Sequence, residues 1–209
     1  MNFTALTTII FLLFLSCVIA RIISTSNRDE NSAGRAFLLR EAEANSTRRA
    51  DISSLDYINI PLSRLPLDAL NCLTDENDRE LSKKLTALAD TKILNLTGYS
   101  NTDLKLMYGP ANLEELMGYD ANYSTLLKLL DKIGTVLYES GNQKQAEKFL
   151  EYAISIGSDI SNTFYVLGCI YAESKNVSGY TGLLDTAQNI DSLSSGIIIR
   201  KLKEIHISD

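Results

Sequence analysis

Residue types that commonly serve in catalysis and metal binding are scarce in this chain. Among 209 residues there is one histidine, His206, there are three cysteines, and there is no tryptophan. Cys17, Cys72 and Cys169 are far apart, with no Cys-x-x-Cys pair and no Cys/His cluster. This pattern excludes the usual zinc and thioredoxin-like spacings and a disulfide framework. We therefore expect free thiols in packed positions, no metal site and no cofactor.

Sequence motifs of common enzymes are also missing. The chain contains no GxSxG, HExxH, Walker loop or GxGxxG, each of which places a nucleophile, a metal ligand or a phosphate cradle at a fixed spacing. His206 stands alone near the C-terminus, and a single imidazole is expected on the surface or in packing. Adjacent acids such as Glu114 and Glu115 point in different directions on a helix. We expect the chain not to be an enzyme, and an enzyme without a recognisable motif is the formal alternative.

The first twenty residues, MNFTALTTIIFLLFLSCVIA, carry no charge. As a helix rising about 1.5 Å per residue they would reach about 30 Å, which is the thickness of a bilayer core. We predict a transmembrane anchor over residues 1–23 that contacts the lipid bilayer through residues 1–20. The alternatives are a cleaved signal peptide, which ordinarily has a basic start that is absent here, and a lipoprotein that uses Cys17.

The flanking charges predict the orientation of that anchor. No lysine or arginine precedes the apolar run, whereas Arg21, Arg28, Arg35 and Arg40 follow it. The positive-inside rule then places the remainder of the chain in the cytoplasm, with an extracytoplasmic location as the alternative. Residues 51–209 hold 14 basic and 22 acidic residues, so this part lacks the basic surface that binds nucleic acid.

The middle of the chain predicts short elements that are joined by breakers. Residues 24–50 are expected to form a juxtamembrane linker and an exposed helix, and residues 51–126 an extended strap followed by covering helices. Pro61 and Pro66 exclude a helix over residues 51–70. Residues 75–90 predict a helix, because acids occupy the first turn and leucines share one side. A Gly-Pro breaker at 109–110 precedes a short helix over residues 111–118.

A short stretch of the sequence returns after 34 residues. Residues 132–142 are KIGTVLYESGN, and residues 166–176 are VLGCIYAESKN. At this shift Gly134 matches Gly168 and Ala153 matches Ala187, while Ala146 is replaced by Tyr180. The spacing resembles the tetratricopeptide repeat (TPR) over residues 127–194.

The resemblance implies an all-α fold of two antiparallel helix pairs, closed by a capping helix and tail over residues 195–209. Small residues would let paired helices approach closely. These repeat-packing residues are Gly134, Ala146, Ala153, Gly168 and Ala187. The dipeptides Gly141-Asn142 and Lys175-Asn176 would supply the turns, where glycine or asparagine adopts left-handed geometry. Two repeats are fewer than a continuous core usually needs, so other helices are expected to cover both ends.

The resemblance also implies a concave binding face built by the first helix of each pair. The residues expected on it are Lys128, Asp131, Thr135, Tyr138, Glu139, Asn162, Tyr165, Cys169, Ala172 and Glu173. TPR domains that clamp a carboxylate use lysine and asparagine at positions where this chain has Asp131, Tyr165, Thr135 and Cys169. Binding of chaperone tails is therefore not expected, and two tyrosines with several acids favour a basic or amphipathic peptide.

These observations together predict a membrane-anchored scaffold or adaptor that binds another protein. The overall plan is also similar to small single-pass bacterial proteins that carry such repeats. The alternative is a structural subunit whose helical half packs against a larger membrane complex or against itself.

Overall fold

The structure, a computed structural model, describes residue 16, residue 21, residues 34–71, residue 73 and residues 75–205. These residues are helical or irregular and none of them forms a β-strand, so the predicted all-α class is confirmed. The chain divides into two compact units. Unit 1 combines Met1–Ile52 with Gly98–Leu113, and unit 2 combines Ser53–Thr97 with Glu114–Asp209. The segment expected over residues 51–126 thus contributes to both units.

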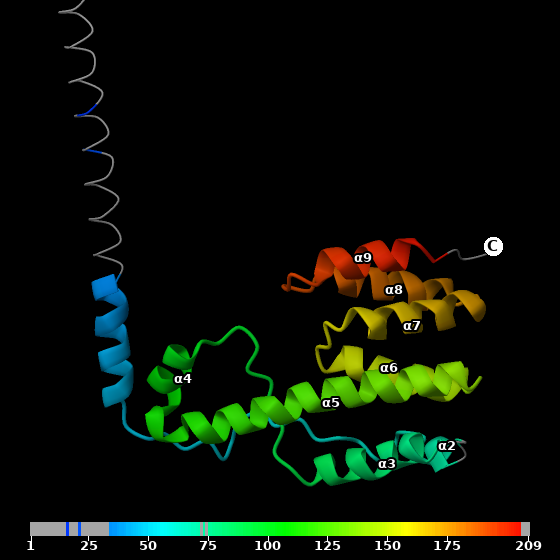
Figure 1. The fold of residues 1–209 in the computed structure, drawn as a ribbon, viewed down its shortest axis with the longest axis horizontal. Helices are drawn as coiled ribbons and strands as arrows, with labels where there is room; N and C mark the ends of the chain where they lie inside the picture. The colour runs from blue at the N-terminus through cyan, green and yellow to red at the C-terminus, as the bar shows by residue number, and fades with distance from the viewer. Residues whose placement is uncertain (1–15, 17–20, 22–33, 72, 74, 206–209) are drawn as a thin grey trace, which may run out of the picture. The chain divides into compact units, whose positions relative to one another are not determined.

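From residue 34 onward, the described elements of unit 1 are a helix over residues 34–46, α4 (Asn101–Tyr108) and the 3-10 turn η1 (Pro110–Asn112) (Figure 1). A capping box starts α4, because the backbone N–H of Asp103 donates to Ser100 Oγ (3.2 Å) and the N–H of Ser100 donates to Asp103 Oδ2 (2.9 Å). Gly109 ends α4 at φ 82°, and Pro110 follows it. The helix therefore stops at the predicted breaker.

A buried asparagine links two segments of unit 1. Asn112 is fully buried, and its side-chain amide donates to the carbonyls of Ala50 (2.8 Å) and Tyr108 (2.7 Å). Its side-chain oxygen accepts from Arg49 Nε (2.8 Å). A buried amide of this kind is stable only when its donors and acceptor find partners, so this residue joins the segment after the first helix to the end of α4.

Unit 2 is a stack of helices that run back and forth (Figure 1). Its helices are α2 (Asp68–Asn71), α3 (Glu76–Ala89), α5 (Leu113–Glu139, all but its first residue), α6 (Gln143–Ser155), α7 (Ser161–Glu173), α8 (Val177–Gln188) and α9 (Ser195–Lys203). α7 packs against α6, α8 and α9, and α8 also packs against α9. The helix expected after residue 195 is thus present and covers α7 and α8. At the other end of the stack α3 buries Leu81, Leu85 and Leu88, as its apolar side predicts.

The turns within the two helix pairs are equivalent. Between α5 and α6 the backbone N–H of Asn142 donates to the carbonyl of Leu137 (2.8 Å). The same bond occurs 34 residues later between α7 and α8, from Asn176 to Tyr171 (2.8 Å). A carbonyl that the end of a helix leaves unpaired is satisfied in this way at both positions.

The left-handed residue of each turn precedes the asparagine. Gly141 has φ 78° and Lys175 has φ 56°, whereas Asn142 and Asn176 keep negative φ values. The expectation that glycine or asparagine takes this geometry is therefore wrong for the second turn. Asn176 instead caps α8, because its side-chain oxygen accepts from the N–H of Gly179 (2.9 Å).

The expected repeat-packing residues all lie in the interior of unit 2. Each of these side chains or glycines is buried: Gly134, Ala146, Ala153, Gly168 and Ala187. Their leucine, isoleucine and phenylalanine neighbours form one hydrophobic cluster that extends from α3 to α9. The small residues thus lie where closely packed helices leave no space for larger side chains.

The two glycines accommodate different helices. A Cβ atom on Gly134 would lie 2.3 Å from Cδ2 of Leu150, so this glycine lets α6 approach α5. A Cβ atom on Gly168 would instead lie 2.8 Å from Leu202 and 2.9 Å from Ile205, at and just after α9. The expectation that Gly168 allows α8 to approach closely is therefore corrected. On the α8 side the ring of Tyr180 lies at an ordinary contact distance, 3.7 Å from the added Cβ atom.

Two expected elements differ from the structure. The short helix predicted over residues 111–118 is not separate, because residues from Leu113 onward continue into the 27-residue helix α5. No proline interrupts this stretch, and the Leu-Glu-Glu-Leu-Met run before Gly118 consists of strong helix formers. The extended strap ends earlier than expected, because α2 begins two residues after Pro66. Proline excludes a helix before it but is compatible with the first turn of one that follows.

No helix in the described part of the chain is long and apolar enough to cross a membrane. The anchor predicted over residues 1–23 lies outside the described residues, apart from Ser16 and Arg21. His206, Cys17 and Cys72 also lie outside them.

Candidate functional site

Side chains of α5 and α7 meet along one polar surface. The amide of Asn162 donates to Asp131 Oδ1 (3.1 Å) and to Thr135 Oγ1 (2.9 Å). The hydroxyl of Thr163 also donates to Asp131 Oδ1 (2.8 Å). These bonds connect residues that are about 30 positions apart and hold the two helices side by side. Three of the residues expected on a concave face are therefore in direct contact.

A second contact joins the two helices closer to their C-terminal ends. The hydroxyl of Tyr138 donates to Glu173 Oε1 (2.5 Å), and the amide of Gln143 donates to Glu173 Oε2. The hydrogen bond to the carboxylate, together with burial, raises the pKa of Tyr138. The tyrosine therefore stays protonated at neutral pH and holds the carboxylate in place.

Between these two contacts lie an aromatic ring and a thiol. Tyr165 is 40% exposed and shares a hydrogen bond with the half-buried Cys169. Burial raises the pKa of the Cys169 thiol. A thiol in this environment stays protonated, which makes it a poor nucleophile. The aromatic ring is the most exposed large apolar group on this surface.

The remaining expected residues lie at the edges. Lys128 and Glu139 are exposed, and Ala172 is half-buried. We call the surface made by Asp131, Thr135, Tyr138, Asn162, Tyr165, Cys169 and Glu173 the α5–α7 strip. It offers carboxylate and hydroxyl oxygens around one exposed tyrosine.

The strip has no arrangement that holds a metal ion. Within the described residues, no three His, Cys, Asp or Glu side chains are placed to share one. The carboxylates of Asp131 and Glu173 each already accept two hydrogen bonds from neighbouring side chains. Chemically, the strip is suited to hydrogen bonding and aromatic contact with a ligand.

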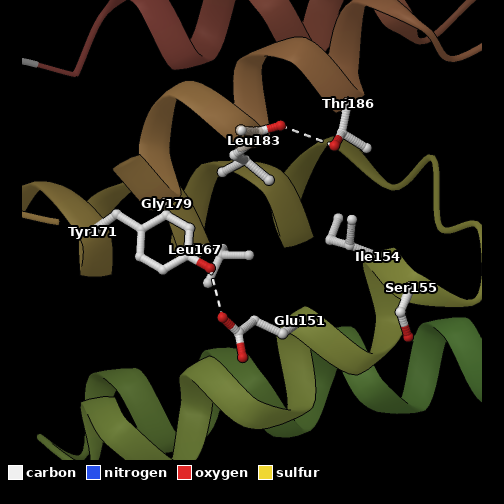
Figure 2. Close-up of a pocket in the computed structure, with 9 residues that line it drawn as sticks. Glu151, Ile154, Ser155, Leu167, Tyr171, Gly179, Leu183 and Thr186 are labelled. Carbon is white, nitrogen blue, oxygen red and sulfur yellow. Dashed lines mark hydrogen bonds between the residues drawn. The ribbon is translucent and has the colours of Figure 1, made fainter. Parts of the chain in front are cut away.

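The opposite face of α7 carries a hollow that the sequence analysis did not anticipate (Figure 2). Its volume is about 370 Å³, and it lies between α6 and α8 with α7 as its floor. The lining residues are Glu151, Ile154, Ser155, Leu167, Tyr171, Gly179, Gly182, Leu183 and Thr186. A Cβ atom on Gly182 would meet nothing within 4 Å, so the missing side chain contributes to the hollow. Gly179 and Gly182, two glycines inside α8, are the sequence feature that could have indicated this hollow.

A tyrosine and a glutamate close one side of this hollow. The hydroxyl of Tyr171 donates to Glu151 Oε1 (2.7 Å). Burial, followed by this hydrogen bond, raises the pKa of Tyr171. Burial and the neighbouring Glu151 charge also raise the pKa of Glu147. The hollow therefore combines apolar walls with an acidic edge.

A third feature is an apolar hollow of about 380 Å³ between α3 and α5. It is lined by Lys84, Ala87, Leu88, Thr91, Thr125 and Leu129. The hydroxyl of Thr91 donates to the carbonyl of Leu88 (2.7 Å), and that of Thr125 donates to the carbonyl of Ala121 (2.8 Å). Because both hydroxyls are satisfied by their own chain segment, the wall of this hollow is nearly all aliphatic.

No protein-family model matches this chain, and no curated protein or solved structure is significantly similar to it.

Proposed function

We propose that this protein is a membrane-anchored adaptor that binds a segment of another protein on the α5–α7 strip. One observation carries the proposal: the amide of Asn162 bonds to both Asp131 and Thr135. This contact holds α5 beside α7, the first helices of the two pairs that match at a shift of 34 residues. It leaves Tyr165 exposed between them. A row of such helices with a projecting aromatic side chain is the kind of surface on which helical repeats bind peptides.

We attribute the two helix pairs to TPR-like repeats. The equivalent turns, the burial of the small residues and the close approach at Gly134 support this assignment. The matching of the pairs is incomplete where Tyr180 replaces the small residue. There, the hydroxyl of Tyr180 donates to the carbonyl of Leu202, so α9 takes part in the second pair.

The membrane anchor is part of the proposal and rests on the sequence of residues 1–23. Their lack of charge and their length favour a single span, and the four arginines that follow favour a cytoplasmic location for the rest. Tethering in this way restricts the adaptor to the membrane surface, where it would meet partners at a raised effective concentration.

The chemistry of the strip favours a basic or amphipathic ligand. Glu139 and Glu173 are exposed at one end, and the ring of Tyr165 is accessible in the middle. An arginine or lysine of the ligand would be attracted to both the carboxylates and the aromatic face. We propose binding rather than catalysis, because the carboxylates of the strip already accept hydrogen bonds that fix the helices.

The proposal is tested by selecting random short peptides against the full chain held in lipid nanodiscs. We expect enrichment of peptides with basic residues, and we expect Tyr165→Ala to abolish their binding. The matched control is Thr181→Ala, a similarly exposed position on α8 that lies outside the strip. Peptide binding that survives Tyr165→Ala, or a selection without enrichment, would contradict the proposal.

The alternative role, a subunit that assembles with a larger complex, is favoured by the aliphatic hollow between α3 and α5. An open apolar surface of this kind is typical of a contact that another protein covers. Size measurement after extraction in mild detergent separates the two roles, because the adaptor is expected to run as a monomer and the assembly subunit as an oligomer.

A further inference from the structure

Three neighbouring apolar side chains are exposed on the helix over residues 34–46. The exposed fractions are 60% for Phe37, 66% for Leu38 and 72% for Leu39. Successive residues of a helix are about 100° apart around its axis, so these three side chains cover about 200° of the circumference. They form an apolar collar around the N-terminal part of this helix, and we call Phe37, Leu38 and Leu39 the Phe-Leu-Leu collar.

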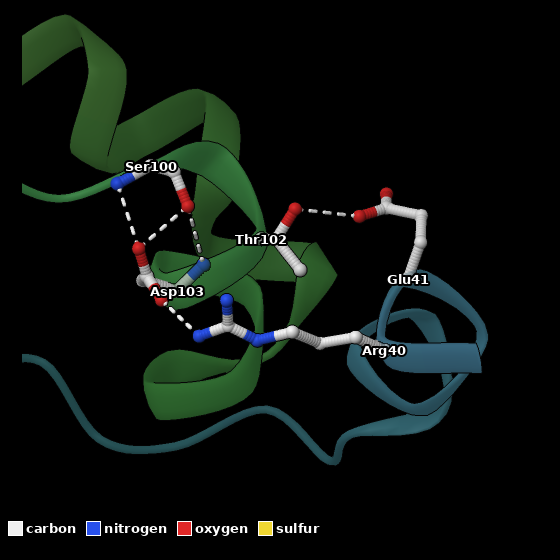
Figure 3. Close-up of polar contacts among 5 residues, drawn as sticks. All are labelled: Arg40, Glu41, Ser100, Thr102 and Asp103. Carbon is white, nitrogen blue, oxygen red and sulfur yellow. Dashed lines mark hydrogen bonds and ion pairs between the residues drawn. The ribbon is translucent and has the colours of Figure 1, made fainter. Parts of the chain in front are cut away.

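Residues that follow the collar join one side of this helix to α4 (Figure 3). Arg40 pairs with Asp103 (2.5 Å), and Glu41 accepts from Thr102 Oγ1 (2.8 Å) and from Lys105. Ala44, one turn further on, is fully buried. These contacts begin at the residue that follows the collar. Within the described part of unit 1, α4 therefore contacts one side of the C-terminal turns of the helix and leaves the collar exposed.

The helix that carries the collar and the three residues after it contain more positive than negative charges. Residues 34–49 contain four arginines and two glutamates. Arg35 is exposed beside the collar, and both glutamates follow it. Arginine side chains can lie along apolar surface with their guanidinium groups among lipid headgroups. Basic residues close to a membrane are attracted to anionic lipids.

We infer that the Phe-Leu-Leu collar rests in the headgroup layer of the bilayer, with Arg35 directed toward lipid phosphates. This inference rests on the proposed anchor over residues 1–23, which would bring the collar close to the membrane. Large apolar side chains on a helix next to arginine are the combination that interfacial membrane helices use. Exposed clusters of this kind in a soluble setting are rare without a partner surface.

The contact has a consequence for unit 1. Because Arg40 and Glu41 join the helix to α4, the whole of unit 1 follows the collar to the membrane surface. The bilayer then binds this protein at two places, the anchor and the collar. This second attachment would hold unit 1 in one orientation at the membrane surface.

The test places a fluorescent label at residue 38 of the full chain, in liposomes that contain anionic lipid. The three native cysteines are replaced by serine, and Leu38→Cys carries an environment-sensitive dye. The matched control is Ala42→Cys, an exposed position one turn later on the same side of the helix. Each label is challenged with brominated lipid, which quenches from the bilayer, and with iodide, which quenches from water.

We expect the label at residue 38 to be quenched severalfold more by brominated lipid, and severalfold less by iodide, than the label at residue 42. Equal iodide quenching at both positions would overturn the inference. Protection from iodide without quenching by brominated lipid would also overturn it, because a protein would then cover the collar. As a second measurement, Phe37→Gln with Leu39→Gln should raise iodide quenching of the label at residue 38, whereas no change would count against the collar.

Failure of the anchor is detected separately. Alkaline carbonate extraction of the full chain reports on residues 1–23, because a spanning segment stays in the membrane pellet. If the chain is extracted, the proposed anchor is wrong. If it stays in the pellet and residue 38 is open to water, the anchor holds and only the collar inference is wrong.

Discussion

Two glycines of α5 should respond differently to the same substitution. Gly134 faces α6, where an added Cβ atom would lie 2.3 Å from Cδ2 and 2.5 Å from Cγ of Leu150. Gly118 lies in the same helix, is exposed, and has nothing within 4 Å of an added Cβ atom. Replacing each glycine with alanine therefore makes the same chemical change in a crowded and in an open environment.

The size of the difference follows from two opposing effects. Alanine in place of glycine inside a helix stabilises by about 1 kcal/mol at either position. At Gly134 the new methyl group also overpacks the interior, which costs about 1–3 kcal/mol because the fully buried Leu150 has little space to move. The helix preference cancels between the variants. Gly134→Ala should therefore be less stable than Gly118→Ala by about 1–3 kcal/mol.

Urea unfolding followed by circular dichroism measures this difference. The full chain is kept in a mild nonionic detergent, and the shift in midpoint at constant slope gives the change in the free energy of unfolding. We expect Gly118→Ala to be more stable than the native chain. Combining Gly134→Ala with Leu150→Ala removes the clash, so the two changes should show a favourable coupling of about 1 kcal/mol or more. A Gly134→Ala variant as stable as Gly118→Ala would refute the close packing of α5 on α6.

Three further predictions concern other parts of the chain. Lys175→Gly should stabilise unit 2 by about 1 kcal/mol, because glycine adopts the φ of 56° without strain; a lower melting temperature would contradict this. Tyr123→Phe should destabilise by about 1–2 kcal/mol, since its hydroxyl bonds to Asn95 and to a carbonyl after α6. Burial raises the pKa of Tyr123 to about 12. The contribution of its hydroxyl to the free energy of unfolding is therefore present below the ordinary tyrosine pKa of about 10 and is lost as pH rises toward 12. The phenylalanine variant should not show this loss in alkaline unfolding. The hydrogen bond from Lys105 lowers the pKa of Glu41. The attachment of the helix over residues 34–46 to α4 is therefore present above the ordinary carboxyl pKa and is lost as pH falls through the lowered value. Amide exchange over residues 34–46 should rise as the attachment is lost, and Glu41→Gln should raise this exchange already at neutral pH.

Local features of the sequence were sufficient to predict most of the helices. The helix α3 and the break at Gly109-Pro110 follow from side-chain periodicity and from backbone restrictions that act within a few residues. The positions of the buried small residues follow from the 34-residue spacing, because equivalent positions in stacked helix pairs face the same kind of neighbour.

The candidate site was predictable only in part. Asp131, Thr135 and Asn162 were expected on one face, and they are in contact. That they satisfy one another was not predictable, because it depends on the distance between α5 and α7. The hollow beside Tyr171 was missed for the same reason, since its lining residues come from three helices, α6, α7 and α8.

The sequence by itself determined most of the helical segments, where the two equivalent turns lie and which small residues are buried, because these properties depend on neighbours along the chain. Only the tertiary structure decided that Gly168 accommodates Leu202, that Lys175 takes the left-handed position and that the Phe-Leu-Leu collar is left uncovered. Such outcomes depend on which distant residues compete for the same space. That competition is settled when the helices pack together.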